Sequence, residues 1–171
     1  LSHIIRRSKE YLNTSNWDDT KKLINLYGIS SALLYLNEHD ITNIELTPEN
    51  IFETTGFHPK IINFVLSKNY INDDQTMPSN EASYQKENSS FNDVYSFGVI
   101  AYFIMTNEYP FEDEKLNNYQ IHQRIKEGNF PSFKKSIGEA YQQLIYDCLS
   151  SDLMKQPTIK EILGDIYFST K

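Results

Sequence analysis

Cysteine is almost absent from this chain, because Cys148 is the only one among 171 residues. No disulfide can form within the chain, which is typical of a protein in a reducing, cytoplasmic compartment. Long hydrophobic runs are missing as well. The most apolar stretch, Val99 to Met105 with its flanks, is much shorter than the roughly 20 residues that cross a bilayer. The sequence therefore predicts no membrane span.

Positive charge is in deficit, since 16 Lys and Arg face 23 Asp and Glu for a net charge of −7. A domain that binds nucleic acid normally carries a basic face, so the composition argues against such a partner. Hydrophobic residues make up 39% and aromatic residues 13%, which argues against global disorder. The four histidines lack the spacing of metal ligands, and they are His3, His39, His58 and His122.

Helical periodicity dominates the rest of the sequence. The segment Ser15-Asn16-Trp17-Asp18-Asp19 is typical of a helix start, with a capping residue and acids in the first turn. Apolar residues at helical spacing then predict a long amphipathic helix to about His39, in which Gly28 marks close packing. A further helix is predicted over Val94–Met105, and because this segment is apolar nearly all round, the helix is expected to be buried. Three more helices are predicted over Leu116–Ile125, which ends before Gly128, over Glu139–Leu149, and after a capping box at Thr158–Glu161.

Between the first two of these helices the pattern changes. Ile51-Phe52 and Lys60-Ile61-Ile62 flank a turn-rich stretch, 54–59, and this arrangement predicts a small β-hairpin. Ser67 to Ser90 is polar throughout and is predicted to be a long loop. The predicted fold class is therefore mainly α, with one hairpin near the middle of a helical bundle.

Three segments match a known set of motifs in the right order. Residues 41–51 read ITNIELTPENI, against I-x-H-R-D-L-K-P-E-N-I. Residues 59–67 read PKIINFVLS, against P-K-I-x-D-F-G-L-S. Residues 92–100 read NDVYSFGVI, followed by Tyr109-Pro110-Phe111, against S-D-V-Y-S-F-G-V-I and P-F. The chain thus resembles the C-terminal lobe of a protein kinase, and looks closest to the tyrosine-kinase-like serine/threonine group. Several such motifs at this spacing are evidence for fold, not for activity.

The resemblance implies that residues 1–171 form a kinase C-lobe, with the N-lobe absent from this chain. Neither a glycine-rich phosphate loop nor a Val-Ala-Ile-Lys strand occurs in the sequence. Leu1 is also not an initiator methionine. We therefore expect the chain to be either an excerpt from a longer protein or a lone C-lobe, without tight binding of ATP.

The resemblance also places the site residues, and several carry altered chemistry. Glu45 stands where the family has its catalytic Asp, and its carboxylate is one methylene longer. Thr47 replaces the lysine that balances charge on the transferred phosphate. Asn50 is retained at the position that binds the second magnesium. Asn63 replaces the magnesium-binding Asp and brings no negative charge. Phe52 falls at the floor of the adenine site.

Other positions differ in the same direction. Ile44 replaces the arginine that pairs with a phosphorylated activation loop, and Val65 replaces the glycine of the metal motif. Glu81 is retained, but Gln156 replaces its arginine partner, which leaves at most a hydrogen bond to a neutral group. Asp93 keeps the acid that, by resemblance, holds the backbone of the catalytic loop.

These substitutions favour a catalytically impaired, kinase-like domain that acts as a binding or regulatory module in phosphorylation signalling. Its protein partners would dock on the helical lobe around Leu116 to Phe133, and no cofactor is expected in this chain. The alternative is an active serine/threonine kinase that uses Mg-ATP, with Glu45 as base and with Asn50 and Asn63 on magnesium. A third reading, an unrelated helical structural protein, is disfavoured by the string from Asp93 to Phe111.

Overall fold

Helices make up most of the described chain, as the sequence predicts. The computed structural model describes residues 17–42, 44, 46–54, 57–62, 79–114, 116, 118–134 and 136–168. The elements are α2 (Asp19–Glu38), η1 (Pro48–Asn50), β1 (Ile51–Glu53), β2 (Pro59–Ile61), α3 (Ser79–Thr106), η3 (Glu112–Glu114), α4 (Asn118–Lys126), α5 (Glu139–Leu149) and α6 (Ile159–Phe168). Among these residues the one sheet has two antiparallel strands, so the mainly α class with a small hairpin is confirmed.

The first described helix, α2, begins at the end of the segment 15–19 that predicts a helix start. Asp18 is its N-cap, and the carboxylate of Asp18 accepts a hydrogen bond from the backbone N–H of Lys21 at 2.9 Å. Asp19 places an acid in the first turn, where it favours the positive end of the helix dipole. The helix ends at Glu38, and its buried face carries Ile29 and Leu33, each at most 1% exposed.

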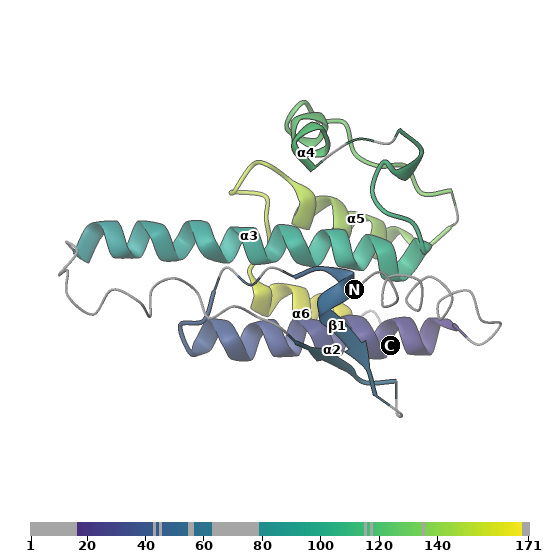
Figure 1. Cartoon of the computed structure of the whole chain (residues 1–171), viewed down its shortest axis with the longest axis horizontal. Helices are drawn as coiled ribbons and strands as arrows, with labels where there is room; N and C mark the ends of the chain where they lie inside the picture. The colour runs from purple at the N-terminus through teal and green to yellow at the C-terminus, as the bar shows by residue number, and fades with distance from the viewer. Residues whose placement is uncertain are drawn as a thin grey trace.

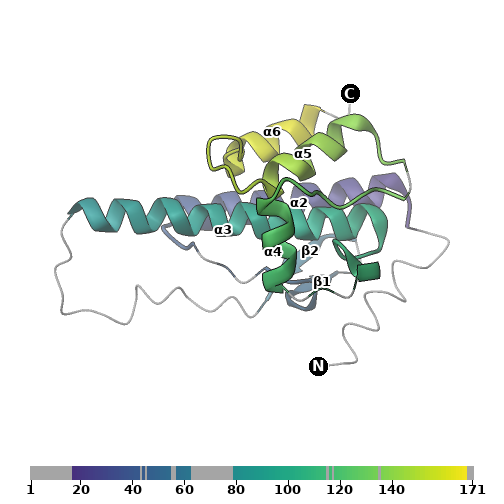
Figure 2. The same ribbon diagram turned by 90° about the horizontal axis from the view of Figure 1, so that it is seen from above.

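The longest helix, α3, forms the centre of the bundle. It lies beside α2, and α5 packs against it on another side (Figures 1 and 2). Val94, Phe97 and Ile100 are at most 2% exposed. A Cβ at Gly98 would lie only 2.9 Å from the Cβ of Cys148, so glycine permits the close approach of α3 and α5. The prediction of a buried helix over Val94–Met105 is confirmed.

The prediction of a loop from Ser67 to Ser90 is wrong over its second half. The helix α3 already begins at Ser79, and residues 67–78 lie outside the described part of the chain. The loop prediction rests on the polar composition of this segment. Polar residues are also compatible with an exposed helix as long as glycine and proline are absent. Neither occurs between Ser79 and Ser90, and Pro78 directly before Ser79 is a common residue at a helix start.

The β-hairpin is confirmed, and its position depends on a glycine in α2. Ile51 pairs with Ile61, Phe52 with Lys60, and Glu53 with Pro59. A Cβ at Gly28 would lie 2.5 Å from Cγ of Pro59, so a larger residue there would push the strand away from the helix. The prediction of close packing at Gly28 is thereby confirmed. The hairpin and α4 lie on opposite sides of α3 (Figure 1).

The last three helices also begin and end close to their predicted limits. α4 ends at Lys126, two residues before Gly128. The capping box of α6 is complete: the backbone N–H of Thr158 donates to the carboxylate of Glu161 at 2.8 Å, and the N–H of Glu161 donates back to the Thr158 hydroxyl at 3.2 Å.

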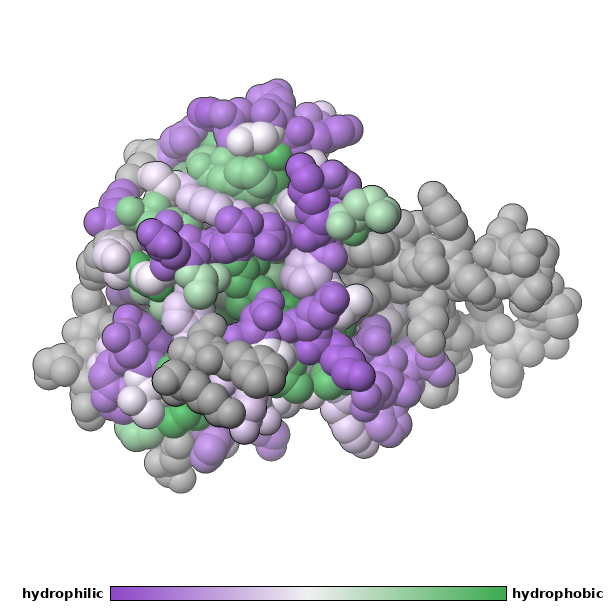
Figure 3. Space-filling view, turned by 180° about the vertical axis from the view of Figure 1, so that it is seen from behind, coloured by the Kyte–Doolittle hydropathy of each residue, from purple (hydrophilic) through white to green (hydrophobic). Residues whose placement is uncertain are grey.

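The surface of the described chain is polar in most places. Seen from behind, its apolar side chains form patches separated by bands of polar residues (Figure 3). Within the described ranges, no helix is both long and apolar enough to span a bilayer.

Candidate functional site

The segment from Ile44 to Leu46 has its backbone held on both sides of position 45. The backbone N–H of Ile44 donates to a carboxylate oxygen of Asp93 at 2.6 Å, and Asp93 is 1% exposed on α3. On the other side, the N–H of Leu46 donates to the carbonyl of Ile44 at 2.7 Å. The role of Asp93 expected from the resemblance is therefore present in the geometry. A charge-assisted hydrogen bond in a buried site is among the stronger ones in a protein.

The side chains on either side of position 45 lie in the hydrophobic core. Ile44 and Leu46 are each 4% exposed and belong to the same buried cluster as residues of α2 and α3. Ile44 occupies the position where the resemblance places an arginine. A guanidinium there would be removed from water, and burying an unpaired charge is strongly unfavourable. The surroundings of Ile44 suit an apolar side chain and not a phosphate-binding cation.

Asn50 ends the 3₁₀ turn that leads into the hairpin. Its backbone N–H donates to the carbonyl of Thr47 at 2.9 Å, and its own carbonyl accepts from the N–H of Ile62 at 2.8 Å. This second bond extends the β1–β2 ladder by one step beyond Ile51 and Ile61. The hairpin register therefore brings Asn50 opposite Ile62, and Asn63 is the next residue in the sequence.

Two of the four site residues expected from the sequence lie outside the described residues, namely Glu45 and Asn63. Their roles stay predictions. Within the described ranges, no group of three or more His, Cys, Asp or Glu side chains is placed to hold a metal ion. The donors expected at this site, Asn50 and Asn63, are neutral amides, whereas magnesium in proteins is usually held by at least one carboxylate. This donor set fits magnesium poorly.

Phe52, the expected floor of the adenine site, lies on β1 opposite Lys60. Its side chain is 40% exposed, so the hairpin presents an aromatic surface to solvent. None of the described contacts shows whether a nucleotide would pack on the Phe52 ring. The expectation that Phe52 contacts adenine therefore stays a prediction.

Two residues of α2, which were not among the site residues expected from the sequence, hold the tip of the hairpin. The ammonium of Lys21 lies 4.2 Å from the centre of the Phe57 ring, a cation–π geometry. The side-chain amide of Asn25 donates to the backbone carbonyl of Phe57 at 3.2 Å and to that of Lys21 at 3.0 Å. The available signal was a polar residue, Asn25, on the buried face of a helix, because such a residue needs a hydrogen-bond partner.

Gln156 has a different role from the one expected. Its amide nitrogen donates to the carbonyls of Cys148 and Ser150 at 3.0 and 2.7 Å, and so satisfies the C-terminal end of α5. An amide nitrogen carries two hydrogens, and both are used. The sequence allowed at most a hydrogen bond from Gln156 to Glu81, and this stays a prediction because the side chain of Glu81 lies outside the described residues. The amide oxygen of Gln156 is buried without a hydrogen-bond partner among the described residues.

Cys148 is a core residue, as its position on an apolar helix face predicts. It is 0% exposed on α5, and burial is the main cause that raises the pKa of its thiol well above the ordinary range, with smaller contributions from Asp147 and Asp165. The thiolate is the reactive form of cysteine, so a buried and protonated thiol is inert. A role as nucleophile is not compatible with this environment.

Comparison with known proteins agrees with the geometry. Residues 3–168 match the family described as "Protein kinase domain". The chain is 27% identical over 168 residues to testis-specific serine/threonine-protein kinase 1 of Mus musculus, which covers 90% of this chain and 45% of that protein. It is 29% identical over 147 residues to protein kinase kin1 of Schizosaccharomyces pombe, covering 80% of this chain and 16% of that protein. The chain therefore spans less than half the length of these curated relatives.

Proposed function

The chain belongs to the protein kinase domain family, and from this premise we propose that it is a C-lobe with impaired catalysis that acts by binding other proteins. The relatives named above are serine/threonine kinases. We place the chain in the tyrosine-kinase-like group on the motif NDVYSFGVI at 92–100, and in the cytoplasm on its single, buried cysteine.

The main support for this proposal is the burial of the Ile44 side chain in a segment whose backbone is hydrogen-bonded to Asp93. The loop backbone is held by Asp93 at 2.6 Å, so the scaffold that would position a catalytic residue is retained. The Ile44 side chain, however, is 4% exposed in the core, where the family has an arginine that pairs with phosphate. Control through a phosphorylated activation loop lacks its cationic partner in such an arrangement.

The expected chemistry of the neighbouring positions supports the same conclusion. Phosphoryl transfer relies on positioning and on positive charge that stabilises the transition state. Thr47 supplies no charge, and the amides of Asn50 and Asn63 attract magnesium less than carboxylates do. Glu45 is the one acid retained at the catalytic position. Because misplacement by roughly 1 Å costs about a hundredfold in rate, its longer side chain is expected to be a poor substitute.

The helical lobe offers a surface for protein partners between α4 and α5. Tyr119 is 72% exposed, and exposed tyrosines are frequent at protein interfaces. The loop after α4 is fixed in place, because the Tyr102 hydroxyl donates to the carbonyl of Ser132 at 2.9 Å and the Tyr146 hydroxyl to that of Pro131 at 3.3 Å. A surface that is already ordered loses little entropy when a partner binds.

A phosphotransfer assay on the full-length protein that contains this chain tests the proposal. We expect no incorporation of phosphate into a protein substrate above the level of a Glu45→Gln variant. The matched control is Glu127→Gln, an exposed acid that follows α4 and lies outside the loop. Phosphate transfer that Glu45→Gln abolishes and Glu127→Gln leaves intact would overturn the proposal.

One observation favours the alternative, an active serine/threonine kinase. The backbone is held on both sides of Glu45, which is the arrangement needed to position a catalytic base. A thermal-shift titration of the full-length protein with Mg-ATP separates the two functions at the binding step, because a ligand stabilises only the state that it binds. The alternative predicts a rise in Tm that grows with Mg-ATP concentration, whereas the main proposal predicts none.

A further inference from the structure

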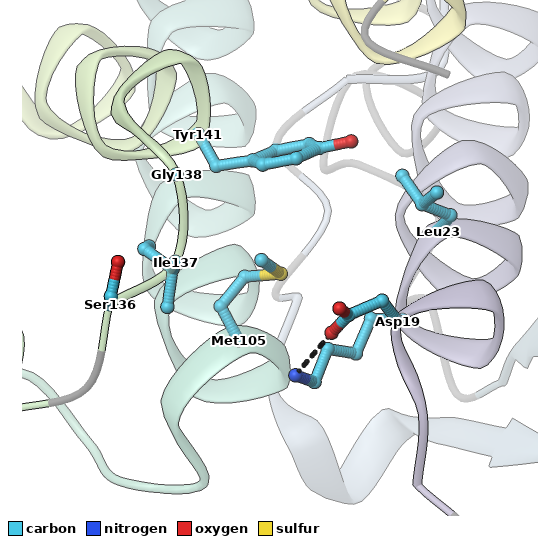
Figure 4. A pocket seen from close by; sticks show the side chains of 8 residues that line it. Asp19, Leu23, Met105, Ser136, Ile137, Gly138 and Tyr141 are labelled. Atoms are coloured by element: carbon cyan, nitrogen blue, oxygen red, sulfur yellow. Dashed lines mark hydrogen bonds and ion pairs between the residues drawn. The ribbon is translucent and has the colours of Figure 1, made fainter. Parts of the chain in front are cut away.

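The chain leaves the helical bundle after α3 and returns to it at α5. The segment between these helices, residues 107–138, contains η3, α4 and the loop that follows α4. Met105 at the end of α3 lines the same pocket as Ile137 and Gly138, which directly precede α5 (Figure 4). The two ends of the segment therefore lie close together. Because its ends meet, part of the segment can move while α3 and α5 stay in place.

The loop at residues 130–134 is the firmly attached part of this segment. Pro131 is less than 2% exposed, and its carbonyl accepts a hydrogen bond from the Tyr146 hydroxyl of α5 at 3.3 Å. The ring of Phe133 lies 5.1 Å from that of Tyr102 on α3. These buried contacts hold the loop to both helices, so the loop belongs to the bundle.

The helix α4, in contrast, is weakly attached. Among its described side chains Ile125 alone is buried, at 2% exposed, while Ile121 and Gln123 are partly buried. The main packing contacts between the described elements join α2, α3, α5, α6 and the hairpin, and none of them involves α4. α4 lies at the edge of the molecule, on the other side of α3 from α2 (Figure 1). Isolated helices shorter than roughly 12 residues are marginal in water, so α4 depends on these few contacts.

The C-terminal end of α4 has the features of a hinge. The N–H of Gly128 donates to the carbonyl of Ile125 and the N–H of Asn129 to that of Arg124, both at 2.9 Å. This Schellman motif satisfies the end of the helix without the bundle. Gly128 has a φ of 83°, and a Cβ there would have no atom within 4 Å. A glycine in open space thus separates a self-contained helix from the attached loop that begins at residue 130.

At the other end, α4 is joined to η3. The guanidinium of Arg124 forms an ion pair with the carboxylate of Glu114 in η3. Directly before η3, Phe111 is partly buried against the core and has a φ of 57°. The residues between Phe111 and Asn129, 112–128, are therefore connected to one another more than to the bundle, and they are called the flap.

We propose that the flap opens from the bundle as one rigid unit, by rotation at Phe111 and Gly128, and that its opening regulates the docking of protein partners. Tyr119, which is 72% exposed, lies on the flap, whereas α5 belongs to the bundle. A partner that contacts both binds only the closed form, so its apparent affinity falls with the fraction of closed molecules. This consequence rests on the proposed function. The opening itself does not, because it is measured without a partner.

Hydrogen exchange of backbone amides, followed by NMR in the full-length protein that contains this chain, measures the opening. The amides of Glu127 and Gly128 are hydrogen-bonded to α4. We expect them, with those of the last turn of α4, to be at least tenfold less protected than amides around Phe97 in α3. A rigid unit gives all flap amides one opening free energy with a weak urea dependence, since opening exposes little surface.

Two results of this measurement would overturn the inference. If the α4 amides have the same protection and the same urea dependence as those of α3, α4 opens only when the whole domain unfolds. If protection instead falls gradually from the middle of α4 toward its ends, the helix frays and does not move as a unit.

Removing the anchor of the flap tests the mechanism. Ile125→Ala is expected to accelerate exchange throughout the flap by about thirtyfold or more, the usual effect of deleting a buried Ile side chain, and to leave α3 unchanged. The matched control is Ile145→Ala on α5, where Ile145 is 1% exposed, and this variant should accelerate exchange in α3 and α5. If Ile125→Ala does not fold, Ile125→Val should give about fivefold with the same pattern. Equal acceleration of α3 and α4 by the Ile125 variant would contradict the inference.

Discussion

The buried half of α3 and the β1–β2 hairpin differ in how their side chains are used. On α3, Asp93 and Phe97 are at most 1% exposed, and Asp93 holds the loop at Ile44. On the hairpin, Phe52 is 40% exposed, and Lys60 is exposed opposite it. The path of the loop thus depends on buried contacts that folding requires. Phe52, which is expected at the adenine site, lies where substitution costs little stability, so it can change while the fold persists.

The largest expected effect comes from restoring family residues on the two sides of the loop. Ile44→Arg places a charge in the core and is expected to destabilise the fold by about 3–5 kcal/mol, the cost of an uncompensated buried charge. Thr47→Lys restores a charge at a half-buried position three residues on, and is expected to cost less than about 1 kcal/mol. Urea unfolding of both variants measures the difference. If Ile44→Arg and Thr47→Lys lost similar amounts of unfolding free energy, burial would not explain which of the two positions tolerates a charge.

A second prediction concerns Asp93 itself. Asp93→Ala leaves the buried N–H of Ile44 without its acceptor and is expected to lower the free energy of unfolding by about 2–3 kcal/mol. Asp93→Asn keeps an oxygen acceptor and should lose less. Chemical denaturation gives both values, and hydrogen exchange at the Ile44 amide checks the mechanism. If exchange at this amide stays as slow in Asp93→Ala as in the unmodified chain, the loop is held by other contacts.

Two glycine substitutions, Gly28→Ala and Gly164→Ala, test the contact between the hairpin and α2. Gly28→Ala would place a Cβ 2.5 Å from Pro59, and we expect a net loss of about 1–2 kcal/mol after the gain in helix propensity. Gly164→Ala in α6 has nothing within 4 Å of the added Cβ, so it should stabilise by up to about 1 kcal/mol. The two variants thus differ in sign. A stabilising Gly28→Ala would mean that the hairpin moves away at no cost.

The smallest expected effect is at the start of α6, far from both regions. Hydrogen bonds from the backbone N–H and then the hydroxyl of Thr158 lower the pKa of Glu161. A carboxyl with a lowered pKa in the folded state stabilises the fold above its unfolded pKa, and this contribution is lost as pH falls through the folded value. Thr158→Ala should cost about 1 kcal/mol at neutral pH.

NMR titration of Glu161 checks the cause of this pH dependence. In Thr158→Ala the pKa of Glu161 should return toward its ordinary value, because the side-chain hydrogen bond is gone. The loop at Ile44 should be unaffected, which makes this variant a control for the two regions compared above. An unchanged pKa would mean that the Thr158 hydroxyl does not contribute to the shift, which would then come from the backbone hydrogen bond alone.

Much of the fold could be predicted from the sequence, because its signals are local. The helix-start segment 15–19, the capping box at Thr158 and the periodicity of Glu139–Leu149 each depend on residues within a few positions of one another. The start of α3 could not be predicted in this way. Between Ser79 and Ser90 the residues are polar, and polarity alone does not distinguish an exposed helix from a loop.

The candidate site was predictable only in part. The resemblance to protein kinases predicted the role of Asp93, which the geometry confirms through its bond to Ile44. It also allowed at most a hydrogen bond between Gln156 and Glu81, whereas the described hydrogen bonds of Gln156 go to the end of α5. A substituted residue forms the contacts that its own donors permit, and family motifs do not encode these.

Local sequence patterns were enough to predict most of the helices, the hairpin and the resemblance to protein kinases. These follow from periodicity, capping and motif order, which are properties of neighbouring residues. The burial of Ile44 and the packing of Pro59 on Gly28 arise only from the way the elements pack in the folded chain. The physical reason is distance along the chain. Asp93 and Ile44 are separated by 49 positions, so their contact depends on how α3 packs in the bundle and not on any local preference.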